Sequence, residues 1–156
     1  MLFRSVLRSP TDPPGHGTRV LYYHLKVVNK RQWLPVENCS VFLHGISRKG
    51  PDDLFHPIPM IVPLQYVWAP AEITPPTVTI IKEQILDFGR MSEGENMFVP
   101  VLYSYSNNFQ GFVKKGEVLR YQLEIRGSNF SSKKYQVFEV ARSEERRVGK
   151  ECRSRW

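Results

Sequence analysis

The 156-residue sequence is poor in cysteine and has no long hydrophobic run. It contains two cysteines, Cys39 and Cys152, and the second lies in an unusual terminal stretch, so we expect no internal disulfide. Between residues 6 and 141 no segment approaches the roughly 20 apolar residues that a membrane-spanning helix needs. The sequence therefore predicts a soluble domain that folds around a hydrophobic core without covalent cross-links.

Motifs that mark catalysis or metal binding are also missing. There is no G-x-S-x-G nucleophile motif, no Walker A loop, and no C-x-x-C or H-E-x-x-H spacing. Asp87-Phe88-Gly89 matches three letters of the kinase magnesium motif, but no glycine-rich loop or HRD accompanies it. We interpret it as the end of a strand followed by a turn, with Phe88 packing inward. We predict that the chain is not an enzyme and needs no cofactor or metal.

Both ends of the chain resemble translated sequencing adapter and not parts of a folded domain. The last fifteen residues, RSEERRVGKECRSRW, have no apolar period. Back-translated as AGA TCG GAA GAG CGT CGT, their beginning resembles a short-read sequencing adapter read in frame. Met1–Ser5 resembles the partner adapter if GTG serves as the start codon. We therefore predict adapter-like stretches at 1–5 and 142–156, the second disordered, a linker at 6–18, and a domain at 19–141.

Setting these stretches aside changes the charge argument. The whole chain carries a formal charge of +7. Without Arg4 and the six basic and three acidic residues of the tail, 15 basic and 12 acidic residues remain, a net charge of +3. Such a modest excess does not indicate a nucleic-acid footprint. The alternative is a genuine basic tail that binds nucleic acid or acidic lipid.

The middle of the chain shows a two-residue period typical of strands. Segments 19–28, 39–46, 118–127 and 135–141 alternate apolar and polar residues, and 29–38 is a polar turn region that contains Trp33. In the second segment the pattern places His44 and Ile46 on the outer face. Prolines within 58–70 and 97–105 favour edge strands. The expected core residues are Leu21, Tyr23, Leu25, Val27, Val41, Leu43, Trp68, Leu119, Tyr121, Leu123 and Ile125.

About seven short strands separated by turns, with no convincing helix, predict an all-β, immunoglobulin-like antiparallel β-sandwich. The segments LKVVN and ENCSVFL resemble the opening strands of immunoglobulin-like, CARDB-type modules of bacterial and archaeal proteins. That resemblance covers residues 19–141 and implies binding, spacing or assembly rather than catalysis. YYHLKVVNK followed by LQYVWAPAE is also similar to uncharacterised bacterial proteins that carry such a domain after membrane helices.

Two histidines offer one metal-site hypothesis. His24 and His44 fall on the polar faces of consecutive predicted strands and would be cross-strand neighbours if those strands pair. With Asp52 or Asp53 they would supply ligands for zinc. The alternative, which the absence of a metal-binding spacing favours, is two surface histidines.

The segment YSYSNNFQGF is the candidate binding loop. It combines rigid aromatic side chains with adaptable amides, a composition typical of binding loops. The alternative is a turn in which Asn107, Asn108 and Gly111 supply left-handed backbone while Phe109 and Phe112 pack onto the core. The candidate binding residues are Tyr103, Tyr105, Asn107, Asn108, Phe109 and Gln110.

The sequence thus predicts a non-enzymatic interaction or spacer domain that binds an unidentified protein and no nucleic acid. Contact with a membrane is expected only through segments outside this chain, as the soluble part of a membrane-attached protein. A cytoplasmic or membrane-associated location follows. The alternative is an accessory domain of a hydrolase or metal-dependent enzyme whose catalytic residues lie outside this chain.

Overall fold

The computed structural model describes residues 2–8, 19–92, 94–132, 134–142 and 152–153. These residues form fourteen strands and no helix, arranged as two antiparallel sheets that pack face to face. No helix within these ranges has the length and hydropathy of a membrane span. The predicted all-β sandwich is confirmed.

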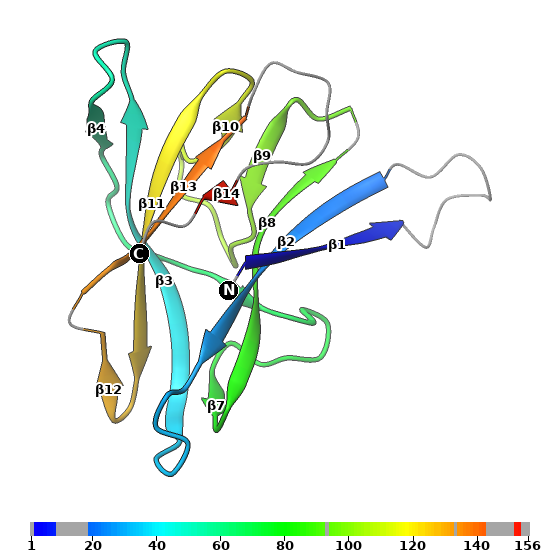
Figure 1. Ribbon diagram of the computed structural model, residues 1–156, viewed down its shortest axis with the longest axis vertical. Helices are drawn as coiled ribbons and strands as arrows, with labels where there is room; N and C mark the ends of the chain where they lie inside the picture. The colour runs from blue at the N-terminus through cyan, green and yellow to red at the C-terminus, as the bar shows by residue number, and fades with distance from the viewer. Residues whose placement is uncertain (1, 9–18, 93, 133, 143–151, 154–156) are drawn as a thin grey trace.

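The smaller sheet has the order β1-β2-β8-β9-β10, and β6 also pairs with β8. Figure 1 shows its long strands β2 and β8 crossing the middle of the molecule. Its strands are β1 (Leu2–Arg8), β2 (Arg19–Val28), β6 (Val67–Trp68), β8 (Glu83–Ser92), β9 (Met97–Pro100) and β10 (Val113–Lys114).

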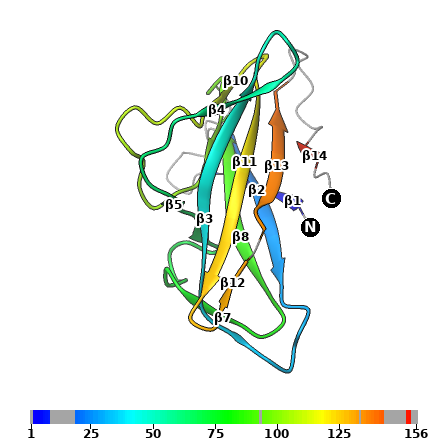
Figure 2. The same ribbon diagram turned by 90° about the vertical axis from the view of Figure 1, so that its left-hand side faces the viewer.

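The larger sheet has the order β14-β13-β11-β3-β4, with β12 on β11 and both β5 and β7 on β3. In Figure 2 its strands β3, β11 and β13 face the viewer, and β2 and β8 lie behind them. Its strands are β3 (Val36–Lys49), β4 (Phe55–Ile58), β5 (Leu64–Gln65), β7 (Val78–Ile80), β11 (Val118–Gly127), β12 (Phe130–Ser131), β13 (Gln136–Ala141) and β14 (Cys152–Arg153).

The described strands outnumber the roughly seven that the sequence predicts, because eight of the fourteen contain only two to four residues. Such short strands carry too little alternation to be recognised from a pattern. Strand β1 lies in the stretch that we interpret as adapter and linker, and β14 lies in the predicted tail. Residues 9–18 of the linker and most of the tail fall outside the described residues. The adapter interpretation therefore stays a prediction.

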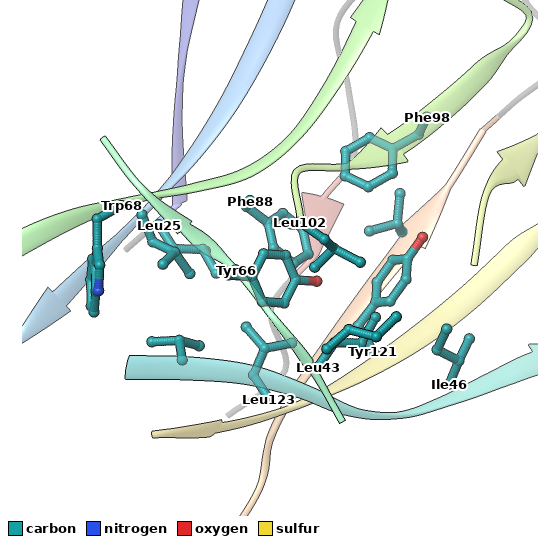
Figure 3. Close-up of a cluster of buried hydrophobic side chains, with 14 of the residues drawn as sticks. Leu25, Leu43, Ile46, Tyr66, Trp68, Phe88, Phe98, Leu102, Tyr121 and Leu123 are labelled. Atoms are coloured by element: carbon teal, nitrogen blue, oxygen red, sulfur yellow. The ribbon is translucent and has the colours of Figure 1, made fainter. Parts of the chain in front are cut away.

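The core lies between the two sheets and contains a cluster of aromatic rings among more numerous aliphatic side chains. Phe88 of β8 is fully buried, and its ring centroid lies 5.4–5.8 Å from those of Tyr66, Phe98, Tyr121 and Phe138. Figure 3 shows Tyr66, Phe88, Phe98 and Tyr121 among the side chains that lie between the sheets. Edge-to-face and tilted ring pairs add specificity to the hydrophobic burial.

Most of the predicted core is confirmed. Leu21, Leu25, Val41, Leu43, Trp68, Leu119, Tyr121 and Leu123 are buried. Tyr23, Val27 and Ile125 are partly buried and pack against the core. The pattern missed core residues that lie on short or irregular strands, among them Tyr66, Phe98, Leu102 and Val113.

A β-bulge in β3 overturns the predicted orientation of Ile46. Leu43 pairs with Leu123 and Gly45 pairs with Gln122, so His44 is an extra residue on β3. An inserted residue reverses the alternation beyond it. Ile46 therefore points into the core, with 3% of its surface exposed, and not outward with His44.

A second bulge, in β8, corrects the interpretation of Asp87-Phe88-Gly89 as a strand end and turn. His24 of β2 pairs with Asp87 and Tyr23 pairs with Gly89, so Phe88 is the extra residue within a continuous strand. Phe88 and Gly89 are both buried, and Phe98 packs directly against the Gly89 backbone. These three residues form the centre of a strand.

Candidate functional site

The candidate binding loop connects β9 to β10 and is held at its start by the backbone. Leu102 forms an isolated antiparallel bridge with Tyr66, and the amide of Tyr103 donates to the carbonyl of Gln65 at 3.0 Å. Tyr103 is 45% exposed and Tyr105 is 43% exposed. Partial burial nevertheless raises the pKa of Tyr103 above its ordinary value. The loop therefore begins on the sandwich body and presents two half-open phenol rings.

Three aromatic rings form a cluster inside this loop. The ring centroid of Phe109 lies 5.5 Å from that of Tyr105 and 5.1 Å from that of Phe112, both in edge-to-face geometry. Phe109 is half-buried and packs against the core, and the Tyr105 hydroxyl donates to the carbonyl of Pro100 at 2.6 Å. For Phe109, the structure therefore supports a packing role.

The backbone of the loop has the conformation that a tight turn requires. Asn108 adopts a left-handed φ of 62°, and the amide of Phe109 donates to the carbonyl of Ser106 at 3.1 Å. Gly111 is buried, and a glycine is needed there for lack of space. A Cβ at this position would lie 2.3 Å from Cζ of Phe109. The hydroxyl of Tyr121 in β11 donates to the Gly111 carbonyl. Asn107, Asn108 and Gln110 remain exposed on this anchored turn.

The histidines do not form the predicted pair. His24 lies in the smaller sheet and His44 in the larger one, so the proposed cross-strand neighbourhood is wrong. Asp52 instead accepts from His56 at 2.9 Å, and Asp53 pairs with Lys49 at 3.1 Å. Among the described residues, no three His, Cys, Asp or Glu side chains gather as metal ligands would.

His24 forms a buried polar contact with Asp87 that the pattern did not predict. Its Nδ1 lies 2.8 Å from Oδ1 of Asp87, and both side chains are about one-tenth exposed. Burial raises the pKa of Asp87, although the nearby His24 opposes that rise. Because Asp87 is adjacent to the bulged Phe88, this pair fixes the irregular part of β8 to β2.

His44 belongs to a chain of polar contacts on the outer face of the larger sheet. Its Nε2 lies 2.8 Å from the hydroxyl of Tyr135, with the two rings stacked, and its Nδ1 lies 3.2 Å from Glu124. Arg126 donates to the same carboxylate at 2.8 Å and lies over the ring of Phe42. These contacts tie the segment before β13 to β3 and β11.

Cys39 lies in the core and not at a reactive surface. It is fully buried, and burial raises the pKa of its thiol to about 11. Because the thiolate is the nucleophilic form, this thiol is suited to packing.

One end of the sandwich carries a cleft that the sequence did not predict. Its volume is about 780 Å³, and Val27 of the smaller sheet lines it together with Val36 and Ile125 of the larger sheet. Lys30 and Arg31 lie at its rim, in the turn between β2 and β3. In the sequence, the one feature that marks this end is Trp33, a large apolar residue next to these cations in an otherwise polar turn.

No protein-family model, curated protein or solved structure matches this chain.

Proposed function

We propose that residues 19–141 form a non-enzymatic, immunoglobulin-like interaction domain of the CARDB type, and that a protein partner binds the loop at residues 103–110. The partner-binding side chains are Tyr103, Tyr105, Asn107, Asn108 and Gln110, with Phe109 as the anchor beneath them. By resemblance, such a domain serves as the soluble part of a membrane-attached protein.

The order of the strands supports the immunoglobulin-like part of this proposal. In such sandwiches the first, second and fifth strands share one sheet, and the third, sixth and seventh share the other. Within residues 19–141, β2 and β8 are neighbours in the smaller sheet, as the second and fifth strands are, and β3, β11 and β13 are neighbours in the larger one. Strand β1 pairs with β2 but lies outside the proposed domain, so it does not enter this comparison. The equivalence gives β11 the position of the sixth strand.

Tyr121 adds a second point of support. Many immunoglobulin-like sandwiches have a tyrosine near the start of the sixth strand, whose hydroxyl bonds to backbone a few residues upstream. Tyr121 is the fourth residue of β11, it is fully buried, and its hydroxyl donates to the carbonyl of Gly111. The contact belongs to both the fold and the loop, because Gly111 closes the candidate binding segment.

The observation that carries the binding proposal is an anchored loop with open side chains. Phe109 and the hydrogen bonds of Tyr105 and Tyr121 hold the loop against the body of the domain. Recognition loses less conformational entropy when the contacting groups are held in place beforehand. Tyrosine and amide side chains on such a support provide contact area together with adaptable hydrogen bonds.

Site-specific photo-crosslinking tests this proposal. A benzoyl-phenylalanine at position 103 should give one discrete protein adduct in extracts of the source cells. The identified partner is then titrated by calorimetry against the chain and against the triple variant Tyr103→Ala, Asn107→Ala, Gln110→Ala. Because these side chains are exposed, we expect binding to weaken at least tenfold while the melting temperature is unchanged.

A photo-crosslinker at position 54 is the matched control, because Leu54 is also an exposed apolar residue of a turn. The same adducts from both positions, or a triple variant that binds the partner as tightly as the original chain, would contradict the proposal.

A further inference from the structure

The end of the sandwich formed by three turns concentrates exposed hydrophobic side chains. We call it the Trp33 end. Figures 1 and 2 both place the β2–β3, β7–β8 and β11–β12 turns together at the lower end of the molecule. Trp33 is 82% exposed. Five of the thirteen exposed large hydrophobic residues in the described ranges lie in these turns or in the strand residue next to them, namely Val28, Trp33, Leu34, Ile81 and Phe130.

A buried asparagine holds two of these turns side by side. Asn29 is 8% exposed, and its Nδ2 donates to the carbonyls of Leu34, Ile80 and Ile81 at 2.9–3.2 Å. Its Oδ1 accepts from the amide of Arg31 at 3.0 Å. The turn that carries Trp33 is therefore fixed next to the turn that carries Ile81.

A second asparagine ties the third turn to the same end. Asn129 donates to the carbonyl of Pro35 at 3.1 Å and accepts from the amide of Glu37 at 3.3 Å. Phe130, the next residue, thereby lies at the rim of the cleft with Leu34. Exposed hydrophobic residues from both sheets are thus held in one arrangement by polar side chains, and not scattered at random.

Positive charge surrounds this apolar end. Lys30, Arg31 and Lys82 are exposed in the same turns, and Glu37 is an exposed acid beside them. These four residues carry a net charge of +2. The carboxylate of Glu83, next to Lys82, is paired with Lys26 at 2.9 Å. The Trp33 end, with apolar side chains surrounded by cations, is therefore complementary to a surface that has a negatively charged outer layer and an apolar interior.

We propose that the Trp33 end docks on the surface of an anionic lipid bilayer. Tryptophan favours the boundary between lipid headgroups and acyl chains, because its ring is large and apolar and its N–H is polar. Trp33 and Leu34 enter that boundary. Lys30, Arg31 and Lys82 contact the lipid phosphates, where each cation near an anionic surface strengthens attachment. The surface is separate from the loop at residues 103–110, and the proposal does not depend on that loop.

Vesicle co-sedimentation with the full chain is the direct test. The chain should bind phosphatidylcholine vesicles that contain phosphatidylglycerol and should bind pure phosphatidylcholine vesicles much more weakly. The double variant Lys30→Gln, Arg31→Gln should lose about 25-fold in affinity, about fivefold for each cation. Trp33→Ala should lose about tenfold, because the apolar area of the indole is no longer buried.

A charge-matched control separates docking from general attraction. Lys114 and Lys115 are also adjacent and exposed, and β10, which contains Lys114, lies at the other end of the molecule in Figure 1. Lys114→Gln, Lys115→Gln removes the same charge and should change the affinity less than twofold. An equal loss in both double variants would overturn the proposal, because it would show attraction without a defined face.

Two further measurements distinguish the bilayer from other occupants. The fluorescence of the chain should shift to the blue on vesicle addition, and Trp33→Phe should abolish that shift. Sedimentation velocity without lipid should show the same mass for the chain and for Trp33→Ala. Docking through this end would be refuted by a dimer that Trp33→Ala dissociates. It would also be refuted by vesicle binding in which the chain and Trp33→Phe show the same fluorescence.

Discussion

The indole N–H of Trp68 donates a hydrogen bond to the backbone carbonyl of Cys39 at 3.2 Å. Trp68 belongs to β6 of the smaller sheet, and Cys39 belongs to β3 of the larger one. This bond therefore connects the two sheets across the core. Trp68 stabilises the core through the burial of its apolar ring and through the hydrogen bond of its indole N–H.

Removing this side chain should destabilise the domain strongly. Trp68 is 0% exposed, so we expect Trp68→Ala to lower the free energy of unfolding by about 3–5 kcal/mol in chemical denaturation. Trp33→Ala is the matched control. Because Trp33 is on the surface, its loss should change stability by less than about 0.5 kcal/mol. Equal effects of the two substitutions would show that the core is misplaced.

The hydroxyl of Tyr121 gives a more selective prediction. Tyr121→Phe keeps the ring in the core and removes the hydroxyl that donates to the Gly111 carbonyl. An unsatisfied buried carbonyl costs about 1–3 kcal/mol, and we expect that loss in the free energy of unfolding. Tyr103→Phe, in the same loop, should leave stability nearly unchanged. Hydrogen exchange should also become faster at the amides of residues 107–112 in Tyr121→Phe, and unchanged exchange there would contradict the anchoring role.

Close approach of an aromatic ring makes Gly89 sensitive to the smallest side chain. A Cβ at this position would lie 2.0 Å from Cζ of Phe98, which is buried and has no room to retreat. We expect Gly89→Ala to cost at least about 1–3 kcal/mol in stability through overpacking. Gly45→Ala is the comparison, because the nearest atom there is the mobile end of the Gln122 side chain, 2.7 Å away. Thermal melts that rank the two variants in the opposite order would argue against this packing.

Much of the sandwich follows from alternation within single strands. The faces of Leu25, Leu43 and Leu123 were predictable because each lies in a regular stretch with one buried and one open side. The reversal at Ile46 was not predictable, since a bulge depends on how β3 pairs with β11. Periodicity within one strand contains no information about its partner, and the same limit applies to Phe88 in β8.

The candidate site divides in a similar way. Composition indicated an exposed loop with Tyr103 and Tyr105, and the turn hypothesis anticipated the left-handed Asn108 and the inward Phe109. The Trp33 end could not be predicted, because its turns are far apart in sequence. Its assembly depends on Asn29, a buried polar residue that ends an ordinary strand pattern.

Glu124 should make the stability of the domain depend on pH in mildly acidic solution. The hydrogen bond from Arg126 holds the pKa of this carboxyl below its ordinary value of 4.5, and His44 acts in the same direction. A carboxyl whose pKa is lower in the folded state stabilises that state above its unfolded pKa. The stabilisation from ionised Glu124 declines as the pH falls below about 4.5, and it is lost once the pH is below the lower pKa that Glu124 has in the folded state. Glu124→Gln should therefore be less stable than the original chain at pH 6, and the difference should shrink toward pH 3.

Thermal melts of both chains across this pH range provide the measurement, and Arg126→Gln provides the control for its cause. In an Arg126→Gln background the pH-dependent part of the Glu124→Gln effect should be smaller, because the largest contribution to the low pKa is gone. Both side chains of the pair reach solvent, so added salt should also weaken the effect. A Glu124→Gln difference that keeps the same size from pH 6 to pH 3 would contradict a lowered pKa at this position.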